Sequence, residues 1–178
     1  MKFKQILTIS TVVAGLSLSG NWNVDTANAK VNFSVKGPFG TVHGSFSGIE
    51  ATINFNEKDL SGSSISASID AKTISTGISL RNRDLRDEEK WLNTDKYPRI
   101  NFRSNKIEKT ANGYKVLGGL TIKGITKPAE IPFTFTSKGT TGLFTGQFTV
   151  KRADYNLGNP GGSVGSAVTV NLIVPVKI

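Results

Sequence analysis

The 178-residue sequence predicts an all-β protein, an antiparallel barrel of about eight strands with one short helical insertion. Apolar and polar residues alternate through most of the chain, as they do in strands with one dry and one wet face. Turn residues separate the alternating segments at short intervals, which favours antiparallel hairpins over parallel crossovers. A closed barrel is expected because closure removes exposed strand edges.

The first residues predict an export signal. Lys2 and Lys4 precede residues 6–18, which carry no charge and no proline. This segment has the length of a signal-peptide core, roughly 7–15 residues, and falls short of the roughly 20 apolar residues of a membrane span. Small residues follow it, so we expect cleavage near Ser19/Gly20.

The expected organisation is therefore a signal peptide over residues 1–20 and one barrel domain over residues 21–178. Ala27-Asn28-Ala29 also matches the small-x-small cleavage pattern. Cutting there would discard Trp22, at which an alternating segment starts, so we interpret this match as accidental.

Composition indicates a soluble protein outside the cytoplasm. The chain has no cysteine, which excludes disulfides, thiolate chemistry and a lipoprotein anchor. With an export signal, this predicts a periplasmic protein, or a secreted one in a host without an outer membrane. Loss of Lys2 and Lys4 lowers the formal charge from +9 to +7. The remaining cations are scattered, which favours a solvated surface and no nucleic-acid binding.

The alternating segments follow one another in chain order, each with its apolar residues on one face. Their apolar residues are Val31, Phe33 and Val35; Ile53 and Phe55; Ile65, Ala67, Ile69 and Ala71; Ile100 and Phe102; Val116, Leu120 and Ile122; Ile131, Phe133 and Phe135; Phe148 and Val150; and Val168, Val170, Leu172, Val174 and Val176.

Turn signals and one helical pattern divide these segments. Gly37-Pro38-Phe39-Gly40 and Asn112-Gly113 are hairpin signals, and residues 156–165 form a glycine-rich loop. Residues 79–93 break the alternation: Leu85 and Leu92 lie seven apart with charges between them, which predicts a short amphipathic helix.

A barrel of this size leaves two alternatives open. Its interior is filled by side chains, or it is just wide enough for one small ligand. Glycines near strands, including Gly44, Gly48, Gly118 and Gly119, would leave space or permit bends and so favour a cavity. The alternation alone does not distinguish a lining from a core.

The sequence gives little support for catalysis. His43 is the one histidine, so a metal site or a serine-histidine pair has no second imidazole, and a solvent-facing ring is expected. Carboxylates such as Asp84 are interpreted as part of a solvated helix face. We therefore expect no enzyme, no metal and no cofactor.

Several short motifs follow one another along the chain. They are Trp22-x-Val24-Asp25, Val31-x-Phe33-x-Val35, Val42-x-Gly44-x-Phe46, Thr76-Gly77, Arg81 through Leu85, Tyr97-Pro98-x-Ile100-x-Phe102-x-Ser104, Gly118 through Pro128, and Arg152-Ala153-Asp154-Tyr155. Taken together, these motifs resemble the YceI-like family, a lipocalin-like group of exported bacterial polyisoprenoid-binding proteins. The resemblance covers nearly all of the expected domain.

The resemblance implies a lipocalin-like barrel holding a long isoprenoid chain, a quinone or polyprenyl lipid, for transport, storage or sequestration. The alternatives are a fatty acid or fatty amide ligand, a lipid-directed enzyme using Asp84 or His43, or a filled barrel that binds an envelope partner through its basic surface. A transient contact with the envelope membrane and a homodimer are further hypotheses.

The expected binding residues are the large apolar residues of the inward faces. Arg81, Arg83 and Trp91, on or near the helical insertion, are assigned to the cavity mouth. The predicted lining consists of Val31, Phe33, Val35, Phe46, Ile65, Ile69, Phe102, Leu120, Ile122, Phe133, Phe135, Phe148 and Val170.

Overall fold

The structure is a computed structural model, and it describes residues 20–159 and 161–178. The expected signal peptide, except for Gly20, therefore lies outside the described residues. Within them are a helix, α1 (Ser79–Asp87), and two 3-10 turns, η1 (Ala71–Thr73) and η2 (Arg152–Tyr155). The strands are β1 (Gly20–Val24), β2 (Lys30–Gly37), β3 (Gly40–Phe46), β4 (Ile49–Phe55), β5 (Ser64–Asp70), β6 (Arg99–Thr110), β7 (Gly113–Ile122), β8 (Ile125–Lys138), β9 (Thr141–Lys151) and β10 (Ala167–Lys177).

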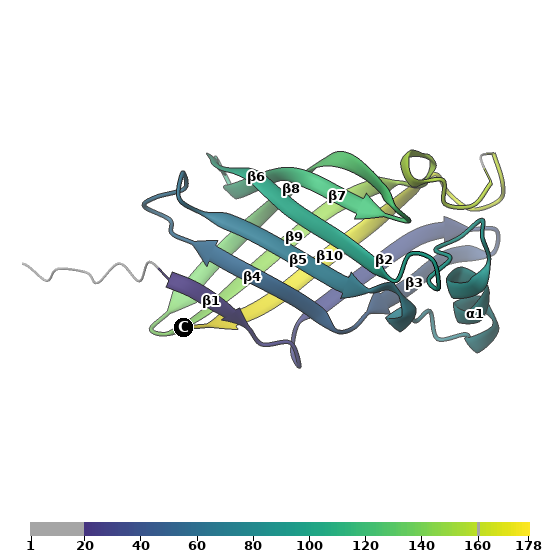
Figure 1. Ribbon diagram of the computed structural model, residues 1–178, viewed down its shortest axis with the longest axis horizontal. Helices are drawn as coiled ribbons and strands as arrows, with labels where there is room; N and C mark the ends of the chain where they lie inside the picture. Colours follow the sequence, from purple (N-terminus) through teal and green to yellow (C-terminus); the bar gives the residue numbers. More distant parts are fainter. Residues whose placement is uncertain (1–19, 160) are drawn as a thin grey trace, which may run out of the picture.

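Eight strands, β1 and β4 to β10, close an antiparallel barrel (Figure 1). Closure occurs at β1, which pairs with β4 on one side and with β10 on the other. Trp22 lies opposite Ile53, and Val24 lies opposite Val176. The predicted fold class, an antiparallel barrel with one short helical insertion, is confirmed.

The β2–β3 hairpin extends this barrel at one end. β2 continues along the free part of β10, with Val31 opposite Leu172, and β3 pairs with β2. A turn separates β1 from β2: the amides of Asn28 and Ala29 donate to the Asp25 carbonyl, 3.1 and 2.9 Å away. Ala27 and Ala29 thus lie between two strands of the domain.

Alternating burial fixes the inner face of the barrel. In β7 every second residue points inward: Tyr114, Val116, Leu120 and Ile122 are buried. Gly118 completes this face where β6 bulges between Ser104 and Lys106. A Cβ at Gly118 would collide with the Arg103 carbonyl, so this glycine permits a close backbone approach. Of the two roles expected for this glycine, leaving space or permitting a bend, its position beside the bulge fits the second.

The helical insertion is shorter than predicted. α1 ends at Asp87, and the chain becomes extended at Glu88, with φ −72° and ψ 134°. Leu92 lies beyond the helix, where its amide donates to the Leu85 carbonyl at 3.0 Å. Leu92 is buried although no residue of α1 is. The predicted helix over residues 79–93 is therefore wrong in its second half.

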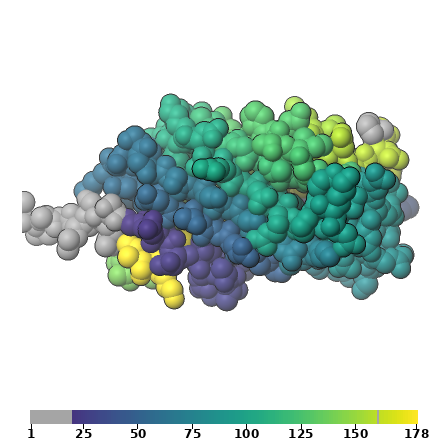
Figure 2. All heavy atoms as spheres, viewed as in Figure 1, coloured from purple at the N-terminus to yellow at the C-terminus, as the bar shows by residue number. Residues whose placement is uncertain are grey.

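The two ends of the barrel differ. Figure 1 shows α1 and its neighbouring turns at one end of the molecule and the C-terminal residue near the other, and Figure 2 shows the elongated outline of the molecule in the same view. Among the described helices, none is long and apolar enough to cross a membrane.

Candidate functional site: an apolar cavity with a bonded rim

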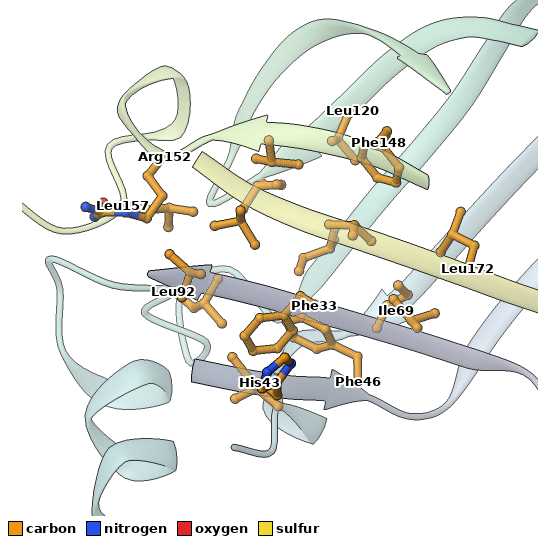
Figure 3. Close-up of a pocket in the computed structure, with 18 of the residues that line it drawn as sticks. Phe33, His43, Phe46, Ile69, Leu92, Leu120, Phe148, Arg152, Leu157 and Leu172 are labelled. Atoms are coloured by element: carbon orange, nitrogen blue, oxygen red, sulfur yellow. Dashed lines mark hydrogen bonds between the residues drawn. The ribbon is translucent and has the colours of Figure 1, made fainter. Parts of the chain in front are cut away.

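A cavity of about 850 Å³ occupies the barrel interior. Most of its lining is aliphatic or aromatic, contributed by the inward faces of β2 to β10 (Figure 3). Among the described lining residues, the charged ones are Arg81, Asp84 and Arg152, from α1 and η2 at the end where the cavity opens. This volume lies in the upper part of the roughly 300–1,000 Å³ typical of ligand pockets. The alternative of a completely filled barrel does not fit this geometry.

The structure places most of the predicted lining residues around this cavity. Those that border it are Val31, Phe33, Val35, Phe46, Ile65, Ile69, Phe102, Leu120, Ile122, Phe133, Phe148 and Val170. Phe135 is not among them. Its ring packs against Phe144 at 4.4 Å and Phe55 at 5.1 Å, centroid to centroid, below the cavity floor. Its assignment to the lining is therefore corrected: alternation sets the face of a strand, but not the depth at which the cavity ends.

Aromatic rings close the floor of the cavity. Phe55, which is 1% exposed, lies at the centre of this cluster. The rings of Tyr114, Phe133 and Phe144 approach it edge-on, with centroids 5.1 to 5.6 Å away. Trp22 of β1 is linked to this cluster, because its indole N–H donates to the carbonyl of Phe55 in β4 at 3.1 Å. Edge-to-face contacts of this kind are favourable, and the rings fill this end of the barrel.

Tyr114 carries a polar group into the floor. Its hydroxyl donates to a Glu57 carboxylate oxygen at 2.7 Å. Burial, followed by this hydrogen bond and the negative charge of Glu57, raises the pKa of Tyr114 to about 12. The phenol therefore stays neutral well beyond the pH at which an exposed tyrosine ionises.

Backbone hydrogen bonds join the segments around the open end into a ring. The β2–β3 hairpin meets the 156–165 loop where the Gly165 amide donates to the Lys36 carbonyl at 2.7 Å. That loop meets the turn after α1 where the Gly158 amide donates to the Lys90 carbonyl at 2.6 Å. The segment before α1 returns to β3 through two bonds between Ser45 and Ser75, at 2.8 and 2.9 Å. These hydrogen-bonded segments border the mouth of the cavity, and together they form its rim.

Arg152 holds the 156–165 loop in place through hydrogen bonds. The residue is 7% exposed and lines the cavity (Figure 3). Its guanidinium donates to the carbonyls of Leu157, Val164 and Gly165, the last two at 2.6 and 2.7 Å. The Trp91 ring lies 5.7 Å from its guanidinium carbon, a cation–π distance. The charge is thus balanced by carbonyl dipoles and an aromatic face.

Gly158 makes the contact between Trp91 and Arg152 possible. Its φ of +71° is unfavourable for other residues, and a Cβ there would lie 2.6 Å from atoms of both side chains. Arg152 was not among the residues predicted for the site. The motif Arg152-Ala153-Asp154-Tyr155 was the only signal in the sequence that could have found it.

The structure divides the residues assigned to the mouth. Arg81 and Trp91 border the cavity, whereas Arg83 does not. Arg83 is exposed on α1, 3.6 Å from a carboxylate oxygen of Asp84. His43 is exposed on the edge strand β3 and also borders the cavity (Figure 3). His43 was expected only to face solvent, and the structure adds that its side chain also borders the cavity.

Further lining residues come from segments whose alternation was visible in the sequence. Val150, Val168, Leu172 and Val174 continue the inward faces of β9 and β10, so the same pattern could have found them. Leu157 and Val164 line the cavity from the 156–165 loop, where no periodicity exists. Their positions depend on Arg152.

The arrangement suits the binding of an apolar molecule. Within the described part of the chain, no three histidine or carboxylate side chains converge as metal ligands. Asp84 and His43 both border the cavity, but in the structure as described they come from different rim segments and share no hydrogen bond. The main property of the cavity is an apolar wall that excludes water from whatever occupies it.

A closed antiparallel eight-stranded barrel around an apolar cavity defines a lipocalin-like protein. Residues 22–175 match the model of the YceI-like domain family, and the chain belongs to that family.

Relatives agree with this assignment. A UPF0312 protein of Pectobacterium atrosepticum is 27% identical over an alignment 187 positions long, which covers 98% of this chain and 96% of that protein. A UPF0312 protein of Yersinia enterocolitica is 29% identical over 138 residues, covering 75% of this chain and 71% of that protein. These alignments extend across most of the barrel.

Solved structures share the fold. The crystal structure of Burkholderia cenocepacia BcnA matches with a TM-score of 0.81 at 26% identity, covering 86% of this chain and 99% of that chain. A polyisoprenoid-binding domain from Saccharophagus degradans, implicated in plant cell wall breakdown, matches with a TM-score of 0.66 at 16% identity. That match covers 88% of this chain and 97% of the other, and at this identity it establishes likeness of fold alone.

Proposed function

We propose that this protein binds one long isoprenoid chain, a quinone tail or polyprenyl lipid, inside the barrel. The observation that carries the proposal is the cavity of about 850 Å³, lined by apolar side chains and closed by aromatic rings at one end. The polyisoprenoid-binding domain from Saccharophagus degradans, which shares the fold, supports this ligand class.

The energetics favour recognition through the tail. A tail of about twenty carbons, at roughly 0.8 kcal/mol per buried CH₂, contributes on the order of 16 kcal/mol before costs. Ordering a flexible chain subtracts much of this. Tight binding therefore needs few polar contacts, and selectivity among apolar chains of similar length should be modest.

The role that follows is carriage, storage or sequestration of a water-insoluble lipid, with no chemical conversion. We place this role outside the cytoplasm, in the periplasm or its equivalent, because of the export signal expected over residues 1–20. Fatty acids and fatty amides would fit the same wall, so they are the alternative ligands for the test.

Cavity-filling variants test the proposal. Ala67 points into the cavity from β5, and its neighbour Ser66 is exposed on the opposite face. Ala67→Phe should lower the uptake of a quinone by about tenfold or more, because the new ring occupies the space of several methylenes of the quinone tail. Ser66→Phe adds the same ring outside and should bind as the unaltered protein does.

The measurement is uptake of a quinone with a long isoprenoid tail, compared with uptake of a fatty acid. Thermal unfolding of both variants shows that each has folded. Equal quinone uptake by the two variants would remove the cavity as the binding site. Uptake of fatty acid alone would keep the cavity and change the ligand.

A further inference from the structure

Exposed apolar side chains gather at the mouth of the barrel. Among the large hydrophobic residues of the described chain, the three with the greatest exposure are Phe39, Leu80 and Ile78, at 102%, 59% and 48%. Phe39 lies in the turn that joins β2 to β3, and the other two lie at the start of α1. Exposed single apolar residues are ordinary, but these three share one end of the molecule.

Both segments belong to the rim of the cavity. Phe39 and its neighbours Pro38 and Gly40 border the cavity, and so does Arg81, the residue after Leu80. Figure 1 shows the β2–β3 turn and α1 at the same end, away from the C-terminal residue. The two segments that carry these side chains therefore lie at the end where the cavity opens.

Most of the charges beside these apolar residues are positive. Lys36 precedes the β2–β3 turn, and Arg81 and Arg83 follow Leu80. The adjoining carboxylate is Asp84, 3.6 Å from the Arg83 guanidinium, so three cations stand beside one anion. Apolar tips flanked by Lys and Arg are the combination that lies at the interface of an anionic bilayer, with apolar groups among the acyl chains and cations among the phosphates.

We propose that the mouth rim, defined by Phe39, Ile78 and Leu80 with Lys36, Arg81 and Arg83, docks on the surface of an anionic phospholipid bilayer. Docking turns the cavity opening towards the membrane, so that a lipid tail can pass between bilayer and barrel with little exposure to water. The benefit of this orientation rests on the proposed lipid-binding function, although the docking itself does not require a bound lipid.

A bilayer fits this rim better than a protein partner does. The apolar tips stand on two separate segments, the turn after β2 and the start of α1, with the cavity opening beside them. A fluid lipid surface adapts to separate protrusions, whereas a protein interface needs a continuous, complementary patch. The excess of cations there, Lys36, Arg81 and Arg83 beside the single carboxylate of Asp84, also matches phosphate-rich surfaces.

The test is flotation of the purified protein with vesicles. Vesicles of phosphatidylethanolamine and phosphatidylglycerol are compared with vesicles of phosphatidylcholine alone. The double variant Ile78→Ser/Leu80→Gln removes apolar tips that do not line the cavity, and serine is a favourable residue at the helix start. Leu143→Gln, at an exposed leucine on β9, is the matched control.

The expected result is binding to the anionic vesicles that weakens with added salt. The double variant should bind these vesicles about tenfold less or weaker still, because two apolar side chains are no longer transferred from water into the bilayer. Arg83→Gln should lower binding about fivefold, and Leu143→Gln should leave it unchanged. Quinone uptake should be the same in all of these variants.

Three results would overturn the docking proposal: no vesicle binding by the unaltered protein, equal binding by the double variant and the control, or a stable complex with an envelope protein in place of vesicles. The two proposals fail separately. Quinone uptake without vesicle binding removes the docking and leaves the lipid-binding function. Vesicle binding that persists in a protein unable to take up quinone or fatty acid removes the function and leaves the docking.

Discussion

Arg152 shows how a single buried cation can organise a loop that carries little regular structure of its own. Three carbonyls of the 156–165 loop accept its guanidinium N–H groups, and the Trp91 ring covers it. Arginine suits this position because its planar fork presents several donors in fixed directions. The loop in turn places Leu157 and Val164 on the cavity wall.

Replacing Arg152 should therefore loosen the rim. Arg152→Met should lower the free energy of unfolding by about 3 kcal/mol, because buried carbonyls lose their donors. Arg152→Lys should recover only part of this, since one ammonium cannot reach all three carbonyls. Lys151→Met, at an exposed neighbour, should change stability by no more than about 0.5 kcal/mol.

Urea unfolding measures these changes, and limited proteolysis within residues 156–165 reports on the loop itself. Equal protease resistance in Arg152→Met and the unaltered protein would show that the loop does not depend on the guanidinium.

Because the pKa of Tyr114 is raised, we expect the folded protein to lose stability in alkali. The pKa of Tyr114, about 12 in the folded protein, lies above its usual value near 10 because the phenol is buried and bonded to Glu57. The folded state thus holds a proton that the unfolded chain releases. The stabilisation is complete below pH 10 and is lost as the pH rises from about 10 to about 12.

Denaturant titrations across this pH range should show that Tyr114→Phe loses less stability than the unaltered protein. Burial also raises the pKa of Tyr155, so part of the alkaline loss should remain in the variant. Parallel curves for the two proteins would contradict the assignment to Tyr114.

The positions of single residues were predicted well where the two-residue period of a strand sets them. They were predicted poorly where contacts between distant segments set them. Phe33 and Phe148 were expected on the inner face, and the structure places them on the cavity wall. Phe135 has the same pattern but packs below the floor, because the ring cluster around Phe55 fills that depth. Nothing within one strand reveals the height of the floor.

At the scale of elements, the segment after α1 illustrates the same limit. Residues 79–93 have helical periodicity, but the chain leaves the helix at Glu88. Trp91 then packs against Arg152 and Gly158, and the Lys90 carbonyl accepts from the Gly158 amide. These partners lie about sixty residues further along the chain, so local propensity could not indicate them.

The β2–β3 hairpin depends on a glycine at a point of close contact. A Cβ at Gly44 would collide with the Phe33 ring and lie 2.8 Å from the Ser75 carbonyl oxygen. Gly44→Ala should therefore lower the free energy of unfolding by about 1–3 kcal/mol and loosen the bonds between Ser45 and Ser75. Gly162→Ala, where the nearest atom is 3.4 Å away, is the control.

Hydrogen exchange at the Ser45 and Ser75 amides, together with denaturant unfolding, measures this effect. Unchanged protection of both amides in Gly44→Ala would show that the hairpin accommodates a methyl group. The comparison also tests the interpretation of this glycine as a contact point, a role that differs from the space or bend expected from the sequence.

At the scale of the whole molecule, the closed antiparallel barrel could be predicted because each strand signal was consistent with its neighbours. Whether that barrel is hollow could not. Val116 and Leu120 are inward-facing apolar residues both in a filled barrel and in a hollow one. The difference arises from the shape of the barrel and from the β2–β3 hairpin, which extends the wall beyond the ring of eight strands.

The central claim is that the cavity holds a long isoprenoid lipid. Its most direct test is native mass spectrometry of the protein purified from the envelope of its own host, followed by organic extraction and identification of the bound molecule. The account predicts one isoprenoid per protein, released on unfolding. A protein that carries no lipid and takes up no added quinone would contradict it.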